Sequence, residues 1–358
     1  MSDSRQFDFS KAVKILDKSN VLGSIESLAD QVKHAWESTQ DIEFKPTAEI
    51  KNVVVAAMGG SALGPDVIKH LFKDQLTVPF EIVNSYSLPK YVDENSLVLL
   101  SSYSGNTEEV MTCAKLAQEK KAQITVITAG GELADLVQEH NYPAYIIDPQ
   151  HNPSNQPRMA IGYAIMGSIG LLAKAGIISV DEDQMLEVIT AILQIDEKCR
   201  IDVTLENNQA KLLALELIDR RPVLVACEFL SGAVHVATNQ FNENAKYFVD
   251  YKIVPEINHH LLEGLDLPKS NASSHIFVFI QSSLYDSHNQ KRLLLTQQAV
   301  ENKDIDTLVV ELKMTNKFTQ VFELITLMAY TNFYLAMLED INPAPIPIVD
   351  WFKDQLKK

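Results

Sequence analysis

Apolar runs alternate with amphipathic segments along most of the chain. Between residues 50 and 149, five apolar runs have the composition of strands buried on both faces: NVVVAAM, FEIVN, SLVLLSSYS, QITVITAGG and AYIIDP. Stretches between them, such as TEEVMTCAKLAQEKKA, carry apolar residues at helical spacing. Strands that alternate with helices in this way predict a parallel sheet with helices on both faces.

The same alternation returns in the second half of the chain. A long helix around 157–176 and a helical stretch at roughly 182–219 come first. They are followed by the strands PVLVACE, HIFVFIQ and DTLVVELKM, and by the helices FLSGAVHVATNQFNENAKYF, NQKRLLLTQQAV and FTQVFELITLMAYTNFYLAML. We therefore predict an α/β protein with two doubly wound parallel-sheet domains, although the order of the strands stays open.

The expected domains are residues 1–180, which include a helical N-terminal extension, and residues 181–358. Helical periodicity covers residues 10–40. The last segment, NPAPIPIVDWFKDQLKK, contains three prolines and so should begin extended, and it should close with a short helix. A tail of this kind usually lies across another surface.

Charge and cysteine content narrow the classes of partner. The chain of 358 residues has a net charge of −16, from 47 acidic and 31 basic residues, and shows no local basic patch. This balance argues against nucleic-acid and membrane partners, and any anion should bind at a small site built mainly from dipoles. Cys113, Cys199 and Cys227 are far apart, which argues against a disulfide framework or a metal site. With no apolar leader at the start, we expect a cytoplasmic protein.

Two glycine-bearing turns follow predicted strands: MGGSALG at 58–64 and SSYSGNT at 101–107. The first does not fit the dinucleotide fingerprint, because Ser61 stands where the second glycine belongs. It does not fit a nucleotide P-loop either, because Pro65 and Asp66 replace the lysine and the hydroxyl residue. What remains is a backbone that can approach a ligand closely, with a helix expected to begin near Asp66.

The second turn offers the hydroxyls of Ser102, Ser104 and Thr107 directly before a helix. Hydroxyls and free amides at a helix start can hold a phosphate without a cationic side chain. In an open α/β sheet, ligands bind at the carboxyl ends of the strands, where both turns should lie. The alternative is that these are ordinary strand-to-helix turns and helix caps.

An ordered set of motifs resembles the bifunctional phosphoglucose/phosphomannose isomerases. The set is MGGS, SYSGNT, QPRMAIGY, NQFNENAK, PEINHH and a C-terminal lysine, and it runs from about residue 50 to the carboxyl end. The resemblance implies two flavodoxin-like sugar isomerase (SIS) domains, a homodimer, and a hexose 6-phosphate as ligand. It also implies that the phosphate is bound by Gly60, Ser61, Ser102, Ser104 and Thr107. No metal or redox cofactor is implied.

The implied reaction interconverts glucose 6-phosphate and fructose 6-phosphate. Moving the carbonyl between C1 and C2 requires a proton shuttle, a group that opens the ring and a group that stabilises an enediolate. The resemblance assigns proton transfer to Glu243, enediolate stabilisation to Arg158, and ring opening to His259 and Lys353. Activity on mannose 6-phosphate stays open, because the segment INPAPIPIVDWFK lacks the threonine associated with that epimer.

Each of these residues also has a simpler interpretation. Glu243 could be a solvated glutamate paired with Lys246, Arg158 could form an interdomain ion pair, and Lys353 could belong to a basic helix end. The histidine pair alone is weak support for a site. Rival functions are a sugar-phosphate sensor and an isomerase of another phosphosugar. An aminosugar synthase is disfavoured, because residue 2 is serine where such enzymes have a cysteine nucleophile.

Overall fold

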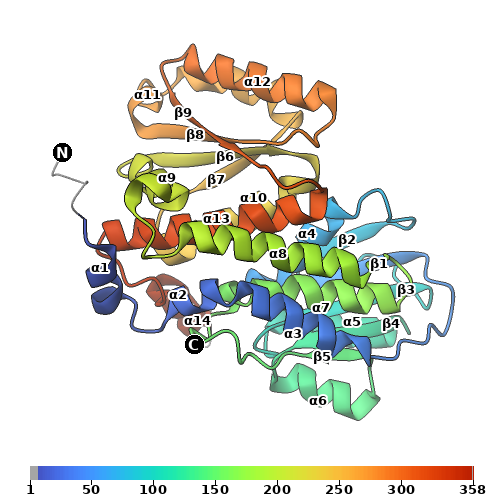
Figure 1. Cartoon of the computed structure of the whole chain (residues 1–358). Helices are drawn as coiled ribbons and strands as arrows, with labels where there is room; N and C mark the ends of the chain where they lie inside the picture. The colour runs from blue at the N-terminus through green and yellow to red at the C-terminus, as the bar shows by residue number, and fades with distance from the viewer. Residues whose placement is uncertain (1–6, 357) are drawn as a thin grey trace.

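The computed structural model describes residues 7–356 and residue 358, and it contains two parallel sheets (Figure 1). The first sheet has the order β2-β1-β3-β4-β5, which is the flavodoxin-like order. Its strands are β1 Asn52–Ala57, β2 Phe80–Val83, β3 Ser96–Ser102, β4 Gln123–Thr128 and β5 Ala144–Ile146. All four strand pairs are parallel, which confirms the predicted first sheet.

The second sheet has the order β7-β6-β8-β9, and all of its strand pairs are parallel too. Its strands are β6 Arg221–Cys227, β7 Asp250–Val254, β8 His275–Gln281 and β9 Asp306–Glu311. The prediction of an α/β protein with two parallel sheets is therefore confirmed, and the strand order is now defined.

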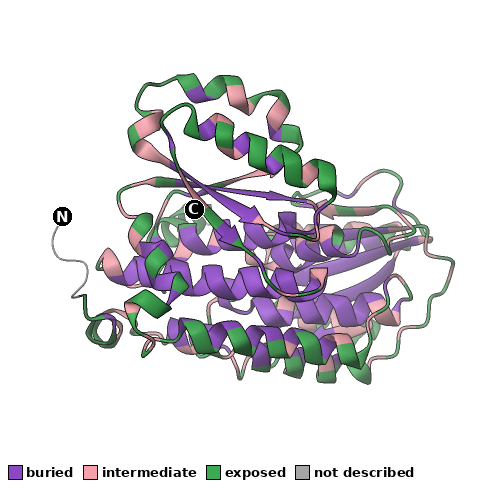
Figure 2. Cartoon of the chain, turned by 45° about the horizontal axis from the view of Figure 1, so that its top comes forward, coloured by how far each residue is buried: buried purple, intermediate pink, exposed green. Residues whose placement is uncertain are grey.

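Helices between the two sheets form the middle of the molecule. They are α3 Leu28–Gln40, α4 Gly60–Leu71, α7 Ile161–Lys174, α8 Glu182–Cys199, α9 Gln209–Glu216, α10 Ser231–Gln240 and α13 Lys317–Leu338. Purple, buried residues run through this layer in Figure 2. Among the described residues, α13 alone has the length and apolarity of a membrane span, and 94% of that window is buried inside the molecule. The apolar residues of α13 therefore pack in the core of the protein.

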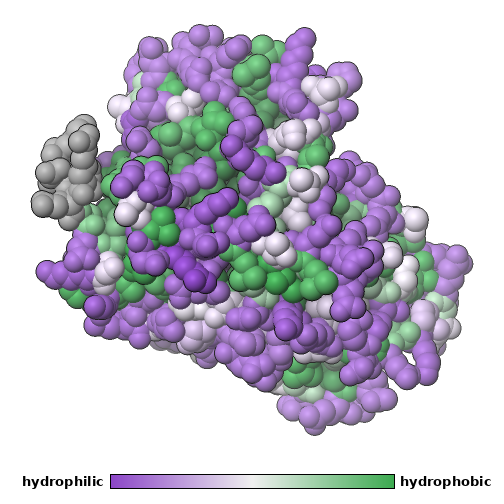
Figure 3. Space-filling view, viewed as in Figure 1, coloured by the Kyte–Doolittle hydropathy of each residue, from purple (hydrophilic) through white to green (hydrophobic). Residues whose placement is uncertain are grey.

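The remaining helices lie on the outside. Helices α5 Glu108–Glu119 and α6 Gly131–His140 flank the first sheet, and α11 Asn271–Ser274 and α12 Ser287–Glu301 flank the second. Helices α1 Phe9–Leu16 and α2 Val21–Glu26 precede α3, and α14 Pro347–Leu356 closes the chain. On the face that carries α3 and α8, hydrophobic residues form separate patches among polar ones (Figure 3). The predicted boundary between residues 180 and 181 stays a prediction.

The first glycine turn differs from its prediction. Helix α4 begins at Gly60 rather than near Asp66, so Pro65 lies inside the helix. Proline has no backbone N–H to bond the carbonyl four residues earlier. Here the Ser101 hydroxyl donates to that carbonyl, on Ser61, at 3.0 Å. Gly59, directly before the helix, has a φ of +51°, which a glycine adopts without steric cost.

The predicted helix over 229–248 is also divided in the structure. Helix α10 ends at Gln240, a π-helical turn covers Phe241–Ala245, and Lys246 adopts a left-handed conformation. The sequence analysis missed β7, an edge strand in which Asp250 is exposed. Polar residues in an edge strand weaken the continuous apolar signal that marks a buried strand.

Candidate active site

The two serine-bearing turns lie against each other. They follow β1 and β3, which are neighbours in the first sheet. The backbone N–H of Tyr103 donates to the Ser61 hydroxyl at 3.0 Å, so the first turn is fixed directly to the second. Both turns lie at carboxyl strand ends, which is where open α/β sheets bind ligands.

Hydroxyls of the second turn converge in front of α5. The side-chain oxygens of Ser102 and Thr107 are 2.7 Å apart, and the Ser102 hydroxyl accepts from the Gly105 N–H at 3.1 Å. The Ser104 hydroxyl is exposed and accepts from the Asn106 N–H at 3.3 Å. Thr107 is the N-cap residue of α5, as predicted, but its hydroxyl is bonded to Ser102 rather than to a helical amide. The first amides of α5 therefore lack a side-chain cap and have donors free for an anion.

Gly60 links the serine turns to Arg158. A Cβ added at Gly60 would be 3.4 Å from the backbone nitrogen of Arg158, so the two backbones lie in van der Waals range of each other. A recess of about 10 Å³ is bordered by Gly60, Ser61, Tyr103 and Pro157, among others. The first serine turn and the turn that carries Arg158 therefore form one continuous surface.

Arg158 lies in the short 3-10 turn Pro157–Met159, and its side chain is 1% exposed. Its Nε donates to Asn244 Oδ1 at 2.5 Å, and one terminal nitrogen donates to the carbonyls of Pro343 and Ala344 at 2.9 and 2.8 Å. The other terminal nitrogen donates to Gln156 Oε1 at 3.0 Å and to Glu243 Oε2 at 3.4 Å.

All five guanidinium donors are thus in use, and the contact with Glu243 is the longest. Burial lowers the pKa of Arg158, while the neighbouring Glu243 carboxylate opposes that shift. An arginine so fully bonded is a fixed positive charge, and the donor aimed at Glu243 is the one most easily redirected.

Glu243 belongs to the π-helical turn Phe241–Ala245 rather than to a regular helix. Its side chain is 30% exposed. Burial raises the pKa of the carboxyl group, and the charges of Arg158, Lys246 and Lys353 act in the opposite direction. A carboxyl group that is partly desolvated yet held among cations can exchange a proton more readily than an exposed glutamate.

Lys246 ends the π-helical turn, and its ammonium group contacts three carbonyl oxygens. These are Glu243 at 2.6 Å, Asn244 at 3.4 Å and Pro343 at 3.0 Å. Partial burial and the positive charge of Arg158 lower the pKa of Lys246 to about 8, although the residue as a whole remains exposed. The alternative interpretation paired Lys246 with the Glu243 carboxylate; in the structure the hydrogen bonds of the Lys246 ammonium group go to backbone carbonyls instead.

Lys353 lies on α14, in which all ten residues are exposed. Its charge is close enough to Glu243 to lower the pKa of that carboxyl group. The tail immediately before the helix is anchored, because Pro343 and Ala344 are buried and their carbonyls are bonded by Arg158. The structure thus brings Lys353 into the same neighbourhood as Arg158 and Glu243.

His259 lies apart from this cluster. It ends the 3-10 turn Glu256–His259 and is exposed, whereas its neighbour His260 contacts the Glu256 carboxylate at 2.9 Å. Glu243 precedes strand β7 and His259 follows it; five residues of strand at about 3.3 Å each separate its ends by roughly 13 Å. Among the described residues, no hydrogen bond or ion pair joins His259 to Arg158, Glu243 or Lys353.

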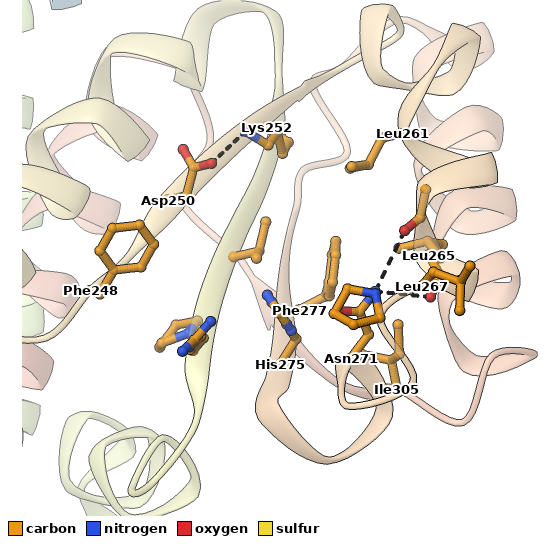
Figure 4. A pocket seen from close by; sticks show the side chains of 15 residues that line it. Phe248, Asp250, Lys252, Leu261, Leu265, Leu267, Asn271, His275, Phe277 and Ile305 are labelled. Atoms are coloured by element: carbon orange, nitrogen blue, oxygen red, sulfur yellow. Dashed lines mark hydrogen bonds and ion pairs between the residues drawn. The ribbon is translucent and has the colours of Figure 1, made fainter.

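Residues 7–356 and 358 contain no cluster of three metal-ligating side chains. A cavity of about 350 Å³ lies elsewhere, near the amino ends of β6, β7 and β8 (Figure 4). Phe248, Leu265, Leu267 and His275 are among the residues that line it, and none of the predicted site residues does.

The sequence analysis missed several groups that shape the site. Gln156, Asn244 and the two tail carbonyls hold Arg158, and the buried Gln240 amide donates to the Arg158 carbonyl at 3.1 Å. Asn244 in turn donates to Asn332 on α13 at 2.9 Å. The nearness of Gln156 to Arg158 and of Asn244 to Glu243 was a usable signal. Carbonyl oxygens carry no side-chain signature at all.

Comparisons with known proteins agree with this architecture. A family model described as the bacterial phospho-glucose isomerase C-terminal SIS domain matches residues 206–356, and the SIS domain model matches residues 48–175. A hypothetical protein from Thermus thermophilus has a similar solved structure, with a TM-score of 0.76 and 16% identity over 98% of this chain and 94% of that one. At that identity the likeness concerns the fold.

Two curated relatives are similar over nearly their whole length, and both are named bifunctional phosphoglucose/phosphomannose isomerase. The protein of Caldicellulosiruptor bescii is 30% identical over 339 residues, which cover 93% of this chain and 98% of the relative. The protein of Thermoplasma volcanium is 27% identical, over 92% of this chain and 97% of the relative. This chain therefore belongs to the bifunctional phosphoglucose/phosphomannose isomerase family and contains its two SIS domains.

Proposed function

We propose that this protein is an aldose–ketose isomerase that interconverts glucose 6-phosphate and fructose 6-phosphate. The observation that carries the proposal is the position of Glu243. A carboxyl group with a raised pKa lies 3.4 Å from the buried Arg158, and the backbone of Arg158 abuts the serine turns at Gly60. One hexose phosphate could span the two parts of this surface.

The 6-phosphate is assigned to the serine turns. Ser61, Ser102, Ser104 and Thr107 supply hydroxyls, Gly60 supplies close backbone approach, and α5 directs its N-terminal dipole at the same place. The hydroxyls bond one another or nearby amides, and rotation of each O–H would redirect it to an ester oxygen.

Proton transfer is assigned to Glu243. As a carboxylate it takes the proton from C2 of the aldose and returns it to C1, which gives the ketose through an enediolate. When Glu243 takes up the proton and becomes neutral, the longest hydrogen bond of Arg158 no longer has a negatively charged acceptor. The developing enediolate can take over that donor, so the positive charge of Arg158 stays balanced through the reaction.

Ring opening is assigned to Lys353 and His259. Lys353 is already near Glu243, whereas His259 of the same chain is separated from Glu243 by strand β7. We therefore propose a homodimer in which the partner subunit's His259 completes the site. The exposed apolar residues of α14, including Ile348 at 80% and Trp351 at 61%, support an interface near this end of the molecule.

The shared site has a direct test. Glu243→Gln and His259→Ala chains should each be nearly inactive alone. Refolded together, they should recover about a quarter of the wild-type rate, because random assortment makes half of the dimers mixed and each mixed dimer has one intact site. No recovery from the mixture would place His259 and Glu243 in one chain, whereas full activity of the His259→Ala chain alone would place His259 outside the reaction.

The substrate assignment is tested by a panel of phosphosugars in an assay that detects glucose 6-phosphate or other aldose products. Turnover of fructose 6-phosphate supports the proposal, and binding without turnover of any member would favour the sensor. A pentulose or heptulose phosphate as the best substrate would assign another isomerase. Mannose 6-phosphate should be converted more slowly than glucose 6-phosphate, because the tail 341–353 contains no threonine.

We also propose a cytoplasmic location without nucleic-acid or membrane partners. The net charge of −16 and three buried free cysteines, Cys113, Cys199 and Cys227, support it. The proposed reaction needs no cofactor, because the proton that Glu243 takes from C2 is returned to C1 and no net oxidation of the sugar occurs.

A further inference from the structure

Lys246 contacts two separate segments of the site at once. Its ammonium donates to the carbonyls of Glu243 and Asn244 in the π-helical turn, and to the carbonyl of Pro343 in the tail that leads to α14. An ammonium group has three N–H donors and no acceptor, so three carbonyl oxygens use all of them. Among the described residues, the hydrogen bonds of this ammonium group all go to backbone carbonyls, and none goes to a side chain.

We infer that Lys246 is a positioning residue for isomerisation, and that its ammonium group joins the turn that carries Glu243 to the tail that carries Lys353. The inference rests on the proposed function, in which these two residues act on one sugar. Lys246 need not touch the substrate; it fixes the distance between two groups that do.

The join depends on charge. A neutral amine has two N–H donors and a lone pair, so deprotonation would leave one of the three carbonyls without its bond and facing that lone pair. The charged groups that face Lys246 are Arg158 and Glu243. The charge of Arg158 lowers the pKa of Lys246, and the charge of Glu243 raises it. Next along the chain, the Tyr247 hydroxyl donates to Glu339 at the end of α13 at 3.0 Å.

Burial and Arg158 lower the pKa of Lys246 to about 8, so this loss of a donor falls in a pH range that an assay can reach. Arg158 also joins the turn to the tail, through Asn244 and the carbonyls of Pro343 and Ala344, but all five of its donors are in use, so it cannot replace a bond that Lys246 loses. We therefore expect the rate to fall in mildly alkaline solution as Lys246 loses its proton.

Kinetics of Lys246→Met give the first test. We expect kcat to fall roughly tenfold or more, because more than one hydrogen bond to a charged group is lost, with a smaller change in KM. The alkaline decline near pH 8 should disappear from the pH profile. Lys313→Met is the matched control, since Lys313 is an exposed lysine whose ammonium is 3.6 Å from Glu311, and it should retain both rate and profile.

A Lys246→Cys chain alkylated with bromoethylamine gives the rescue test. The three native cysteines are buried, so the new thiol is the one most open to the reagent. Alkylation restores an ammonium of similar length that is less basic than lysine. The rate should recover, and the alkaline decline should move to lower pH. A rate and profile in Lys246→Met equal to wild type, or no recovery on alkylation, would overturn the inference.

Fluorescence separates failure of this inference from failure of the proposed function. Trp351 on α14 is one of two tryptophans, so a Trp36→Phe background isolates it. Its emission anisotropy should decrease as pH rises through about 8, and the transition should be absent with Lys246→Met. If the wild-type chain turned over no phosphosugar but showed this transition, the proposed function would be refuted, and the role of Lys246 in joining the turn to the tail would be supported. Turnover without the transition would refute the join.

Discussion

In the proposed function, the serine turns and the Glu243 cluster would bind anions in different ways. The turns use hydroxyls and backbone dipoles from residues 59–64 and 101–107, two short segments after neighbouring strands. The Glu243 cluster uses three cations, Arg158, Lys246 and Lys353, which come from three separate segments, and the carbonyls at 343–344 anchor Arg158 and Lys246. A phosphate needs stable coordination, whereas a transient enediolate beside a proton-shuttling carboxyl group needs fixed positive charge.

The contrast has a consequence for variants. Changes in the serine turns should mainly weaken binding, whereas changes in the Glu243 cluster should mainly reduce turnover. The most severe test of this separation is Glu243→Gln. It should lower kcat by roughly 100-fold or more, because the general base is lost, while fructose 6-phosphate binding changes little.

Glu197→Gln on α8 is a suitable control for the Glu243 variant, because Glu197 is exposed on a helix outside the site. Calorimetry and a continuous assay at saturating substrate provide the two readouts. Full turnover by Glu243→Gln would show that Glu243 does not transfer the proton, and the proposed separation of binding from turnover would then be wrong.

Arg158→Lys tests whether the cluster needs five donors or only a charge. Lysine has three donors and cannot reproduce the planar fork, so a tail carbonyl and Asn244 would lose their bonds. We expect a loss of about 2–4 kcal/mol in the free energy of unfolding, together with a fall in kcat. Urea unfolding of the wild-type and Arg158→Lys chains measures the first effect. If the variant had wild-type stability and rate, Arg158 would contribute only its positive charge.

The sequence predicted the serine turns better than it predicted the Glu243 cluster. The apolar runs predicted eight of the nine strands, and SSYSGNT predicted both its place before a helix and its hydroxyls, because these are local properties. Strand β7 was missed because its polar edge positions break the apolar run. The anchoring of Arg158 by Pro343 and Ala344 joins residues 185 and 186 positions apart, and no local pattern encodes such a contact.

Ser102→Ala sharpens the binding half of the comparison. It removes a hydroxyl that lies 2.7 Å from the Thr107 hydroxyl and accepts from the Gly105 amide. We expect KM for fructose 6-phosphate to rise roughly tenfold, as for one hydrogen bond to a charged ester, with kcat much less affected. Ser179→Ala, at an exposed serine far along the chain, controls for the substitution itself. A fall in kcat alone would place Ser102 with the proton-transfer groups instead.

Lys353→Met should lower the rate less than Glu243→Gln does, because His259 shares the proposed ring opening, and it should have a defined effect on pH dependence. Activity requires ionised Glu243, whose pKa burial already raises, so kcat/KM should rise with pH through a value above that of an ordinary glutamate. Lys353 lowers that pKa, so its removal should move the acid limb to higher pH. An unmoved limb would show that Lys353 does not act on Glu243 in solution.

The central claim is that one sugar phosphate spans both regions. A crystal structure of the Glu243→Gln chain soaked with fructose 6-phosphate tests it most directly. The account predicts the ester within hydrogen-bonding distance of Ser61, Ser102 and Thr107, and C1 and C2 beside residue 243 and Arg158. An ester bound away from both serine turns, or a sugar whose C1 and C2 point away from Arg158, would contradict it.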